Sequence, residues 1–254
     1  MVININGFEI NYTDEGNGQP ILFLHGWGSS LSVWNFIVNH LKQQNKYRLV
    51  ALDFPGCGES SVPENPLQLE DYTSLVVEFC KHLNINEPTV FGHSHGGRVT
   101  LALAGNKMLN IKKAVLFGAA GLKPSKNIKT KIKVFTFKAV KFFLTLPIIK
   151  NYTQDTLNKA RKHFGSSDYN NAPPVMRKTL VNLVNEDLTD ILPKISCSVL
   201  LIWGSHDTAV PLYLAKKMEK LIPDAGLCVL DGCSHFAFIE RPGDTNIIID
   251  SFLN

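Results

Sequence analysis

Short apolar runs alternate with amphipathic segments along most of the chain. The run Ile21–Leu24 ends at His25-Gly26, as buried strands bounded by glycine commonly do, whereas Asp71–Leu83 carries apolar residues at helical spacing. Patterns of the first kind predict eight strands, at Val2–Asn6, Phe8–Thr13, Ile21–Leu24, Arg48–Leu52, Thr89–Phe91, Ala114–Phe117, Val199–Trp203 and Leu227–Leu230. Patterns of the second kind predict helices at Leu31–Gln43, Asp71–Leu83, His95–Ala104, Pro211–Leu221 and Thr245–Leu253.

The order of these elements predicts an α/β fold. Strands that alternate with helices indicate a mostly parallel sheet, here of eight strands, with helices on both faces. The alternation stops at residues 122–190, which are typical of several helices without a clear strand. We therefore expect a core formed by residues 1–121 and 191–254, and a helical lid formed by residues 122–190. The lid would lie above the carboxyl ends of the strands, where open α/β sheets build their sites.

The composition is typical of one globular domain, and it also indicates the cellular compartment of the protein. The 254 residues are 44% hydrophobic and carry a net charge of +4, which excludes disorder as the main state. We find no apolar run long enough for a transmembrane segment, and no signal peptide at the N-terminus. The five cysteines are odd in number and lack a C-x-x-C pair, so we expect reduced thiols and a cytoplasmic protein.

Positive charge is concentrated in the middle of the chain. Between Glu87 and Asp155 there is no acidic residue, but there are Arg98 and eleven lysines. Within this stretch, residues 126–146 place apolar side chains on one helical face, which favours a lid helix packed over a site. A weak contact of this basic segment with an anionic membrane surface is the alternative. We do not expect nucleic acid as a partner, because no nucleic-acid-binding fold is recognisable.

A candidate nucleophile follows the fifth predicted strand. Gly92, Ser94 and Gly96 form the pattern G-x-S-x-G between an apolar strand and a helix of small residues, the context that this motif requires. At such a sharp turn the Ser94 hydroxyl stands clear of the sheet, and the helix N-terminus behind it offers free N–H groups. The competing interpretation is a glycine-rich turn in which Ser94 only caps the helix.

A serine hydroxyl needs a base and an acid to become a nucleophile at neutral pH. His235 and Asp207 are the candidates, because each lies in a loop directly after a predicted strand and so at the same edge of the sheet. The order Ser94, Asp207, His235 is nucleophile, acid, base. The alternatives are that Asp207 caps the next helix and that His235 is an ordinary surface residue.

Two backbone N–H groups are candidates for an oxyanion hole. The glycine-rich loop after Ile21–Leu24 can point the N–H of Trp27 into the site, opposite the N–H of His95 that follows the nucleophile. We predict no metal site, because His25, His93 and His95 lack a ligand spacing, and no cofactor. The segment Gly56-Cys57-Gly58 imitates a dinucleotide-binding loop but lacks the third glycine and an immediate helix.

Taken together, these residues resemble the α/β-hydrolase superfamily over nearly the whole chain. The segments that carry the resemblance are His25-Gly26-Trp27-Gly28, Asp53-Phe54-Pro55-Gly56-Cys57-Gly58-Glu59-Ser60, Gly92-His93-Ser94-His95-Gly96-Gly97, Trp203-Gly204-Ser205-His206-Asp207, Gly232-Cys233-Ser234-His235 and Glu240-Arg241-Pro242. The chain looks like the small, lid-bearing members: carboxylesterases, carbon–carbon bond hydrolases of ring-cleavage products, and haloperoxidase-like esterases. Serine at position 94, in place of aspartate, disfavours epoxide hydrolase and dehalogenase chemistry.

The resemblance implies a serine hydrolase that works through an acyl-enzyme. We expect a carboxylesterase that acts on small esters with an apolar group, so its partner would be a small-molecule ester or ketone. Two alternatives stay open: a carbon–carbon bond hydrolase of ring-cleavage dienoates, and a hydrolase-fold small-molecule receptor or signalling protein with little turnover. The sequence leaves the oligomeric state open.

Overall fold

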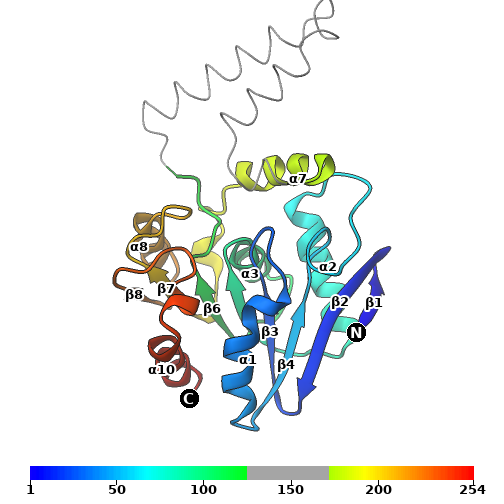
Figure 1. The fold of residues 1–254 in the computed structure, drawn as a ribbon. Helices are drawn as coiled ribbons and strands as arrows, with labels where there is room; N and C mark the ends of the chain where they lie inside the picture. Colours follow the sequence, from blue (N-terminus) through cyan, green and yellow to red (C-terminus); the bar gives the residue numbers. More distant parts are fainter. Residues whose placement is uncertain (125–171) are drawn as a thin grey trace, which may run out of the picture.

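The computed structural model describes residues 1–124 and 172–254, and it confirms the predicted eight-stranded, mostly parallel sheet (Figure 1). The strands lie in the order β1-β2-β4-β3-β5-β6-β7-β8. Strand β2 runs antiparallel to both of its neighbours, and all later pairs are parallel. The bounds are β1 Val2–Ile5, β2 Phe8–Gly16, β3 Gln19–Leu24, β4 Tyr47–Leu52, β5 Thr89–His93, β6 Lys113–Phe117, β7 Ser198–Gly204 and β8 Ala225–Leu230.

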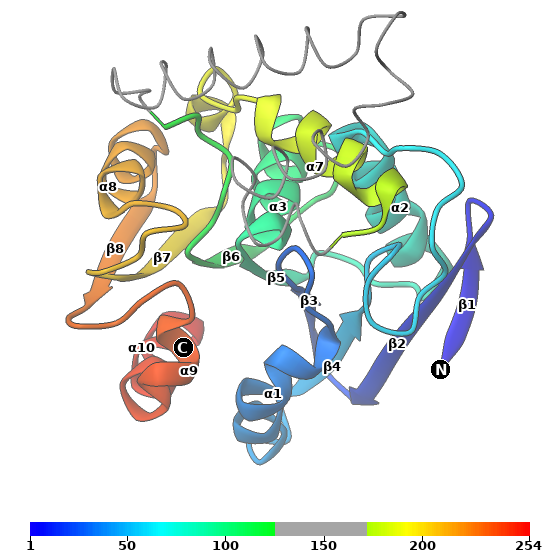
Figure 2. The same ribbon diagram turned by 45° about the horizontal axis from the view of Figure 1, so that its top comes forward.

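Helices cover both faces of the sheet, as the strand–helix alternation predicts (Figure 2). On one face lie α1 (Asn35–Lys42), α9 (Ala237–Glu240) and α10 (Pro242–Leu253). On the other lie α2 (Leu69–His82), α3 (His95–Gly105) and α8 (Leu212–Leu221). Two short 3₁₀ turns, η1 (Leu31–Trp34) and η3 (Leu192–Lys194), and helix α7 (Pro174–Asn185) complete the described elements.

The central strand β3 shows how the two cores form. Its side chains alternate across the sheet, so Ile21 and Phe23 join the core beneath α1 and α10, whereas Leu22 and Leu24 join the core beneath α2 and α3. All four are fully buried. A strand buried on both faces reads as a continuous apolar run, which is why the sequence predicts this element directly.

Several elements differ from the predicted ones, among them the predicted helix Leu31–Gln43, which is divided into η1 and α1. Strand β2 extends to Gly16, three residues past its predicted end, because its polar residues still pair with β4. The four-residue helix α9 was not predicted, and α10 begins at Pro242, three residues early, with proline in its first turn. The predicted turn between the first strands is confirmed: Asn6 and Gly7 both have positive φ, as in a tight hairpin.

Part of the predicted lid lies outside the described residues. Residues 172–190 contain α7 and no strand, and Figure 1 shows α7 above the carboxyl ends of the strands. The Thr179 hydroxyl accepts a hydrogen bond from the N–H of Leu67 at 3.0 Å, and Asn182 donates to the carbonyl of the same residue at 3.1 Å. Helix α7 is therefore held to the long loop between β4 and α2. The predicted basic helix at residues 126–146 lies outside the described residues.

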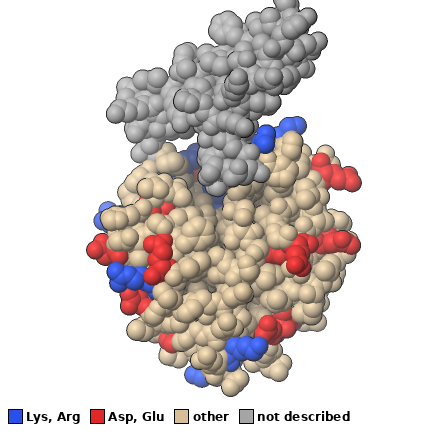
Figure 3. Space-filling view, viewed as in Figure 1, with Lys and Arg blue, Asp and Glu red and all other residues tan. Residues whose placement is uncertain are grey.

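The face in Figure 3 carries charged side chains of both signs, in small groups over the described part. Of the twelve cations between Glu87 and Asp155, five are described: Arg98, Lys107, Lys112, Lys113 and Lys123. None of the helices among the described residues is long and apolar enough to cross a membrane.

Asp53 ties together the loops that surround the carboxyl ends of β3 and β4. Its buried carboxylate accepts hydrogen bonds from the Leu31 N–H at 2.6 Å, the Glu59 N–H at 3.0 Å and the Asn11 side-chain amide at 2.8 Å. The donors use both oxygens, so an amide in this place would turn an N–H group toward another donor.

We expect Asp53→Asn to lower the free energy of unfolding by about 2–3 kcal/mol, because buried donors lose their acceptor. Asp231→Asn is the matched control: Asp231 is exposed and accepts one hydrogen bond from Ser205. That control should change stability by less than about 0.5 kcal/mol. Urea unfolding measures both variants, and equal losses would refute the role assigned to Asp53.

Candidate active site

Ser94 occupies a strained turn between β5 and α3. Its φ of 50° and ψ of −108° lie in a region that side-chain-bearing residues rarely adopt. The turn is held from both sides, because the Ser94 N–H donates to the carbonyl of Phe117 and its carbonyl accepts from the N–H of Ala120. The predicted strand–turn–helix context is therefore present, with Ser94 at the N-terminus of α3.

Close backbone approaches explain the glycines around this turn. A Cβ at Gly92 would lie 2.7 Å from the Thr100 hydroxyl and 2.8 Å from the Gly96 carbonyl, closer than side-chain atoms come to such groups. A Cβ at Gly96 would overlap the carbonyl of Leu24 at the end of β3. Helix α3 thus packs against two strands at its first turn, and this packing sets the position of Ser94.

His235 and Asp207 form a hydrogen-bonded pair, as predicted. His235 Nδ1 lies 2.8 Å from Asp207 Oδ2. The other carboxylate oxygen accepts the N–H groups of Ala209 and Val210, at 2.9 and 2.8 Å. Because a carboxylate only accepts, His235 Nδ1 is the donor, and Nε2 is the ring nitrogen that this bond leaves free. The pair lies in the loops after β7 and β8.

The carboxyl end of β6 lies between Ser94 and this pair. Phe117 accepts the N–H of Ser94, and the next residue, Gly118, lies against the pair: a Cβ there would be 3.0 Å from His235 Nδ1 and 3.1 Å from Asp207 Oδ2. Ser94 and His235 line the same cavity, but no hydrogen bond joins their side chains within the described residues. The structure therefore brings the three predicted residues to one edge of the sheet.

Two N–H groups beside Ser94 have no acceptor in the part of the chain that the structure describes. Neither Trp27 nor His95 donates its backbone N–H to any group among residues 1–124 and 172–254. Their neighbours do bond: the Gly96 N–H donates to the carbonyl of His25 at 3.1 Å, and Ser29 donates to Gly26. Both residues line the cavity that contains Ser94. These are the two donors that the sequence predicts for an oxyanion hole.

His25 braces the loop that carries Trp27. Its Nδ1 lies 2.7 Å from the carbonyl of Gly26, and its Nε2 accepts the N–H of Phe54 at 2.9 Å. This arrangement requires a neutral ring with the proton on Nδ1. Burial lowers the pKa of His25, which favours the same uncharged form.

The rings of the two histidines beside Ser94 pack on opposite faces of the sheet. His93 packs against His235 and Phe238, and its Nε2 donates to the carbonyl of His235 at 3.2 Å. His95 lies among Phe54 and Tyr72 on the other face of the sheet. Burial lowers the pKa of His93 to about 3 and holds that of His95 well below the ordinary value. Both rings are therefore uncharged at neutral pH.

The cavity above Ser94 has a volume of about 650 Å³. Most of its described wall is apolar, and the wall includes residues of α7 and α8. It also contains two cations, Arg98 and Lys123, and no acidic residue among the described lining. The sequence prediction missed Arg98, although its position four residues after Ser94 puts both on one helix face. The sequence prediction also missed Gly118, because the pattern of apolar and polar residues does not show that this glycine has a positive φ.

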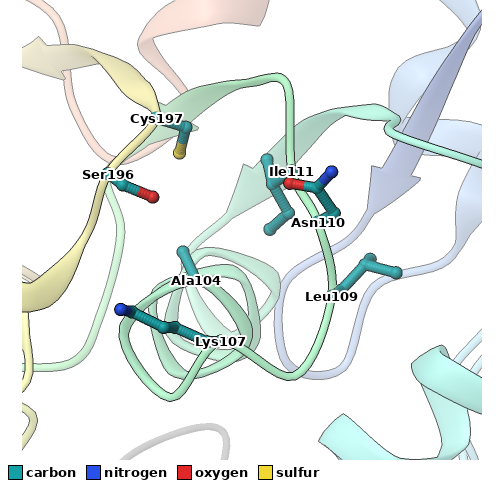
Figure 4. Close-up of a pocket in the computed structure, with 7 residues that line it drawn as sticks. All are labelled: Ala104, Lys107, Leu109, Asn110, Ile111, Ser196 and Cys197. Carbon is teal, nitrogen blue, oxygen red and sulfur yellow. The ribbon is translucent and has the colours of Figure 1, made fainter.

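Other hollows and side-chain groups of the described structure are less suited to bind a ligand or to react with it. A second hollow of about 240 Å³ lies at the far end of α3, between Ala104 and the loop that carries Cys197 (Figure 4). No group of three or more histidine, cysteine or acidic side chains could hold a metal ion in the described ranges. All five cysteines are described and are free thiols.

Comparison with known proteins places this geometry in a family. The sequence profile described as alpha/beta hydrolase fold matches residues 19–242. A 2-hydroxy-6-oxo-6-(2'-aminophenyl)hexa-2,4-dienoic acid hydrolase of Metapseudomonas resinovorans is 25% identical, over 99% of this chain and 90% of its own. A pimeloyl-[acyl-carrier protein] methyl ester esterase of Vibrio vulnificus is 25% identical, over 92% and 94%. Among solved structures, an esterase from Exiguobacterium antarcticum superposes with a TM-score of 0.77 at 25% identity, over 99% and 98%.

The chain belongs to the α/β-hydrolase fold family. The match covers most of the chain, and the strand order, the helices on both faces and the elbow at Ser94 agree with the resemblance seen in the sequence. Its relatives include esterases and hydrolases of ring-cleavage products, so a hydrolase-type enzyme is supported by fold and similarity together.

Buried neutral histidines make stability depend on pH. The pKa of His93 is lower in the folded state than in the unfolded chain, so the unfolded chain binds more protons between about pH 3 and 6.5. The stability contributed by the neutral ring is complete above the unfolded pKa and falls as the pH drops below it. The loss approaches about 1.4 kcal/mol per pH unit.

Between pH 6 and 4, we expect His93→Asn to reduce the slope of the unfolding free energy against pH by about 1.4 kcal/mol per pH unit. Denaturant titrations at several pH values measure the slope. His206→Asn is the control, because an exposed ring is solvated in both states. An unchanged slope in His93→Asn would contradict a neutral, buried His93.

Proposed function

We propose that this protein is a serine hydrolase in which Ser94 is the nucleophile, His235 the general base and Asp207 the acid that orients it. One observation carries the proposal: Asp207 holds Nδ1 of His235, so Nε2 is the ring nitrogen left to take a proton, and that histidine shares a cavity wall with a serine held in a strained elbow. A serine that only capped α3 would need neither the strain nor this pair. Within the described helix α3, no backbone N–H donates a hydrogen bond to the Ser94 hydroxyl, as capping would require.

The proposed reaction proceeds through an acyl-enzyme. Ser94 Oγ attacks the carbonyl carbon while His235 Nε2 takes its proton, and Asp207 stabilises the imidazolium that forms. The free N–H groups of Trp27 and His95 hold the oxyanion of the tetrahedral intermediate, aided by the positive end of α3. His235 then returns the proton to the leaving group. Water, deprotonated by the same histidine, hydrolyses the acyl group and restores Ser94.

A small carboxylic ester with an apolar group is the proposed substrate. The described cavity wall is largely apolar. Leu180 and Leu183 of α7 contribute to this wall, which supports our proposal that residues 122–190 form a lid. The methyl ester esterase of Vibrio vulnificus and the Exiguobacterium esterase support ester chemistry. The free thiols support the cytoplasmic location that we propose.

Hydrolysis of a carbon–carbon bond is the second candidate. The dienoic acid hydrolase of Metapseudomonas resinovorans is similar over almost the whole chain, and the same three residues can serve such a reaction. A ring-cleavage dienoate hydrolysed far faster than simple esters would favour this candidate.

Ser94→Ala should abolish both turnover of 4-nitrophenyl butyrate and labelling by a fluorophosphonate. The loss in kcat should reach about a millionfold or the limit of detection, because the residue that forms the covalent bond is gone. Ser205→Ala, at an exposed hydroxyl bonded to Asp231, is the control and should label like the wild type. Labelling that persists in Ser94→Ala would end the proposal.

Gly118→Ala tests the placement of the His235–Asp207 pair. The added methyl group would push against both side chains, so we expect kcat to fall at least tenfold in a folded protein. Gly7→Ala is the matched control: Gly7 also has positive φ, but nothing lies within 4 Å of its added Cβ. Activity assays and thermal unfolding of both variants separate backbone strain from displacement of the pair. Equal activity in the two variants would contradict the placement.

A further inference from the structure

Arg98 is a buried cation that the proposed mechanism does not use. It follows Ser94 by four residues on α3, and only 7% of its surface is exposed. Its Nη1 is fully buried and has no hydrogen-bond partner among residues 1–124 and 172–254. Burial lowers the pKa of this guanidinium to about 10, so it remains charged at neutral pH.

No acidic group in the described structure compensates this charge directly. Glu186 and Asp187 act on Arg98 at longer range, but neither forms an ion pair with it, and both are exposed to solvent. Asp187 instead accepts hydrogen bonds from the N–H and hydroxyl of Thr189. A buried charge that has no ion-pair partner among the described residues is unfavourable for the fold, and a bound anionic group would compensate it.

The position of Arg98 shows that an anionic group would have to enter the cavity above Ser94 to contact it. Arg98 lines the same cavity as Ser94 and His235, and Lys123 adds a second positive charge to the wall. No acidic side chain belongs to the described lining, because Asp207 lies behind His235. Along the helix axis, Ser94 and Arg98 are separated by roughly 6 Å.

We propose that Arg98 is a specificity-determining residue that binds a carboxylate group on the substrate, while Ser94 attacks a carbonyl carbon a few bonds away. The planar guanidinium can donate two parallel hydrogen bonds to a carboxylate, which neutral esters cannot accept in the same way. The remaining wall is apolar, so the preferred substrate is a monoanionic acid with an apolar body. The reaction in this inference rests on the proposed function. The preference for a negatively charged substrate rests on Arg98 alone.

A matched pair of substrates tests the preference. 3-Acetoxybenzoate and its methyl ester carry the same acetyl ester, and the charged carboxylate of the first is replaced by a neutral methyl ester in the second; release of acetate is the reaction measured for both. We expect the wild type to have a kcat/KM at least tenfold higher for the acid, mainly through KM. In Arg98→Gln this ratio should fall at least tenfold, and in Arg98→Lys it should fall to an intermediate value. Arg241→Gln is the control, because Arg241 is exposed and paired with Asp244, and it should keep the wild-type ratio.

Binding without turnover separates this inference from the proposed function. Benzoate, but not benzamide, should raise the Tm of the wild type and of Ser94→Ala, and the shift should disappear in Arg98→Gln and shrink in Arg98→Lys. Arg98→Met should unfold at the same temperature as the wild type or higher, because it removes an uncompensated charge.

Two results would overturn the inference: equal Tm shifts with benzoate and benzamide, or an acid-to-ester ratio unchanged by Arg98→Gln. A large drop in Tm for Arg98→Met together with that unchanged ratio would assign Arg98 to the fold instead. Failure of Ser94 to react with a fluorophosphonate would remove the proposed reaction, yet a benzoate shift that depends on Arg98 would still establish the anion site.

Discussion

The close approach of helix α3 to strands β3 and β5 is the constraint on which the site depends. Only hydrogen atoms fit at Gly92 and Gly96, so the helix can begin directly behind the strand and its first N–H groups stay open. The cost is the strained backbone of Ser94, of the order of 1–3 kcal/mol. Packing of the strands and helices on either side, together with the bonds to Phe117 and Ala120, compensates this strain.

The groups around this turn have well-defined ionisation states and fixed positions. His25, His93 and His95 are buried and uncharged, so each contributes shape or a directed hydrogen bond without a field of its own. The carboxylate of Asp207 contacts His235, and two backbone N–H groups fix its second oxygen. The positive groups, Arg98 and the start of α3, therefore act on the cavity largely unopposed.

Much of the fold and the candidate site could be predicted because apolar runs end where loops with polar residues begin. Ser94, Asp207 and His235 each follow such a run, and parallel strands bring their carboxyl ends together. Arg98 could not be predicted, since an arginine on a helix is usually solvated and only the packing around it shows its burial. The extension of β2 depends on pairing with β4, a contact between distant segments that local pattern does not contain.

The separation of β6 from its neighbour β7 has a consequence for biosynthesis. About 80 residues lie between Phe117 and Ser198, yet the two strands pair side by side in the sheet, with only β8 beyond them among the described strands. At roughly 5–20 residues per second, the ribosome needs about 4–16 s to add them. Throughout that interval the nascent chain presents the apolar edge of β6 unpaired, a template for association with other chains. Chaperone shielding is therefore most valuable to this protein before β7 has emerged.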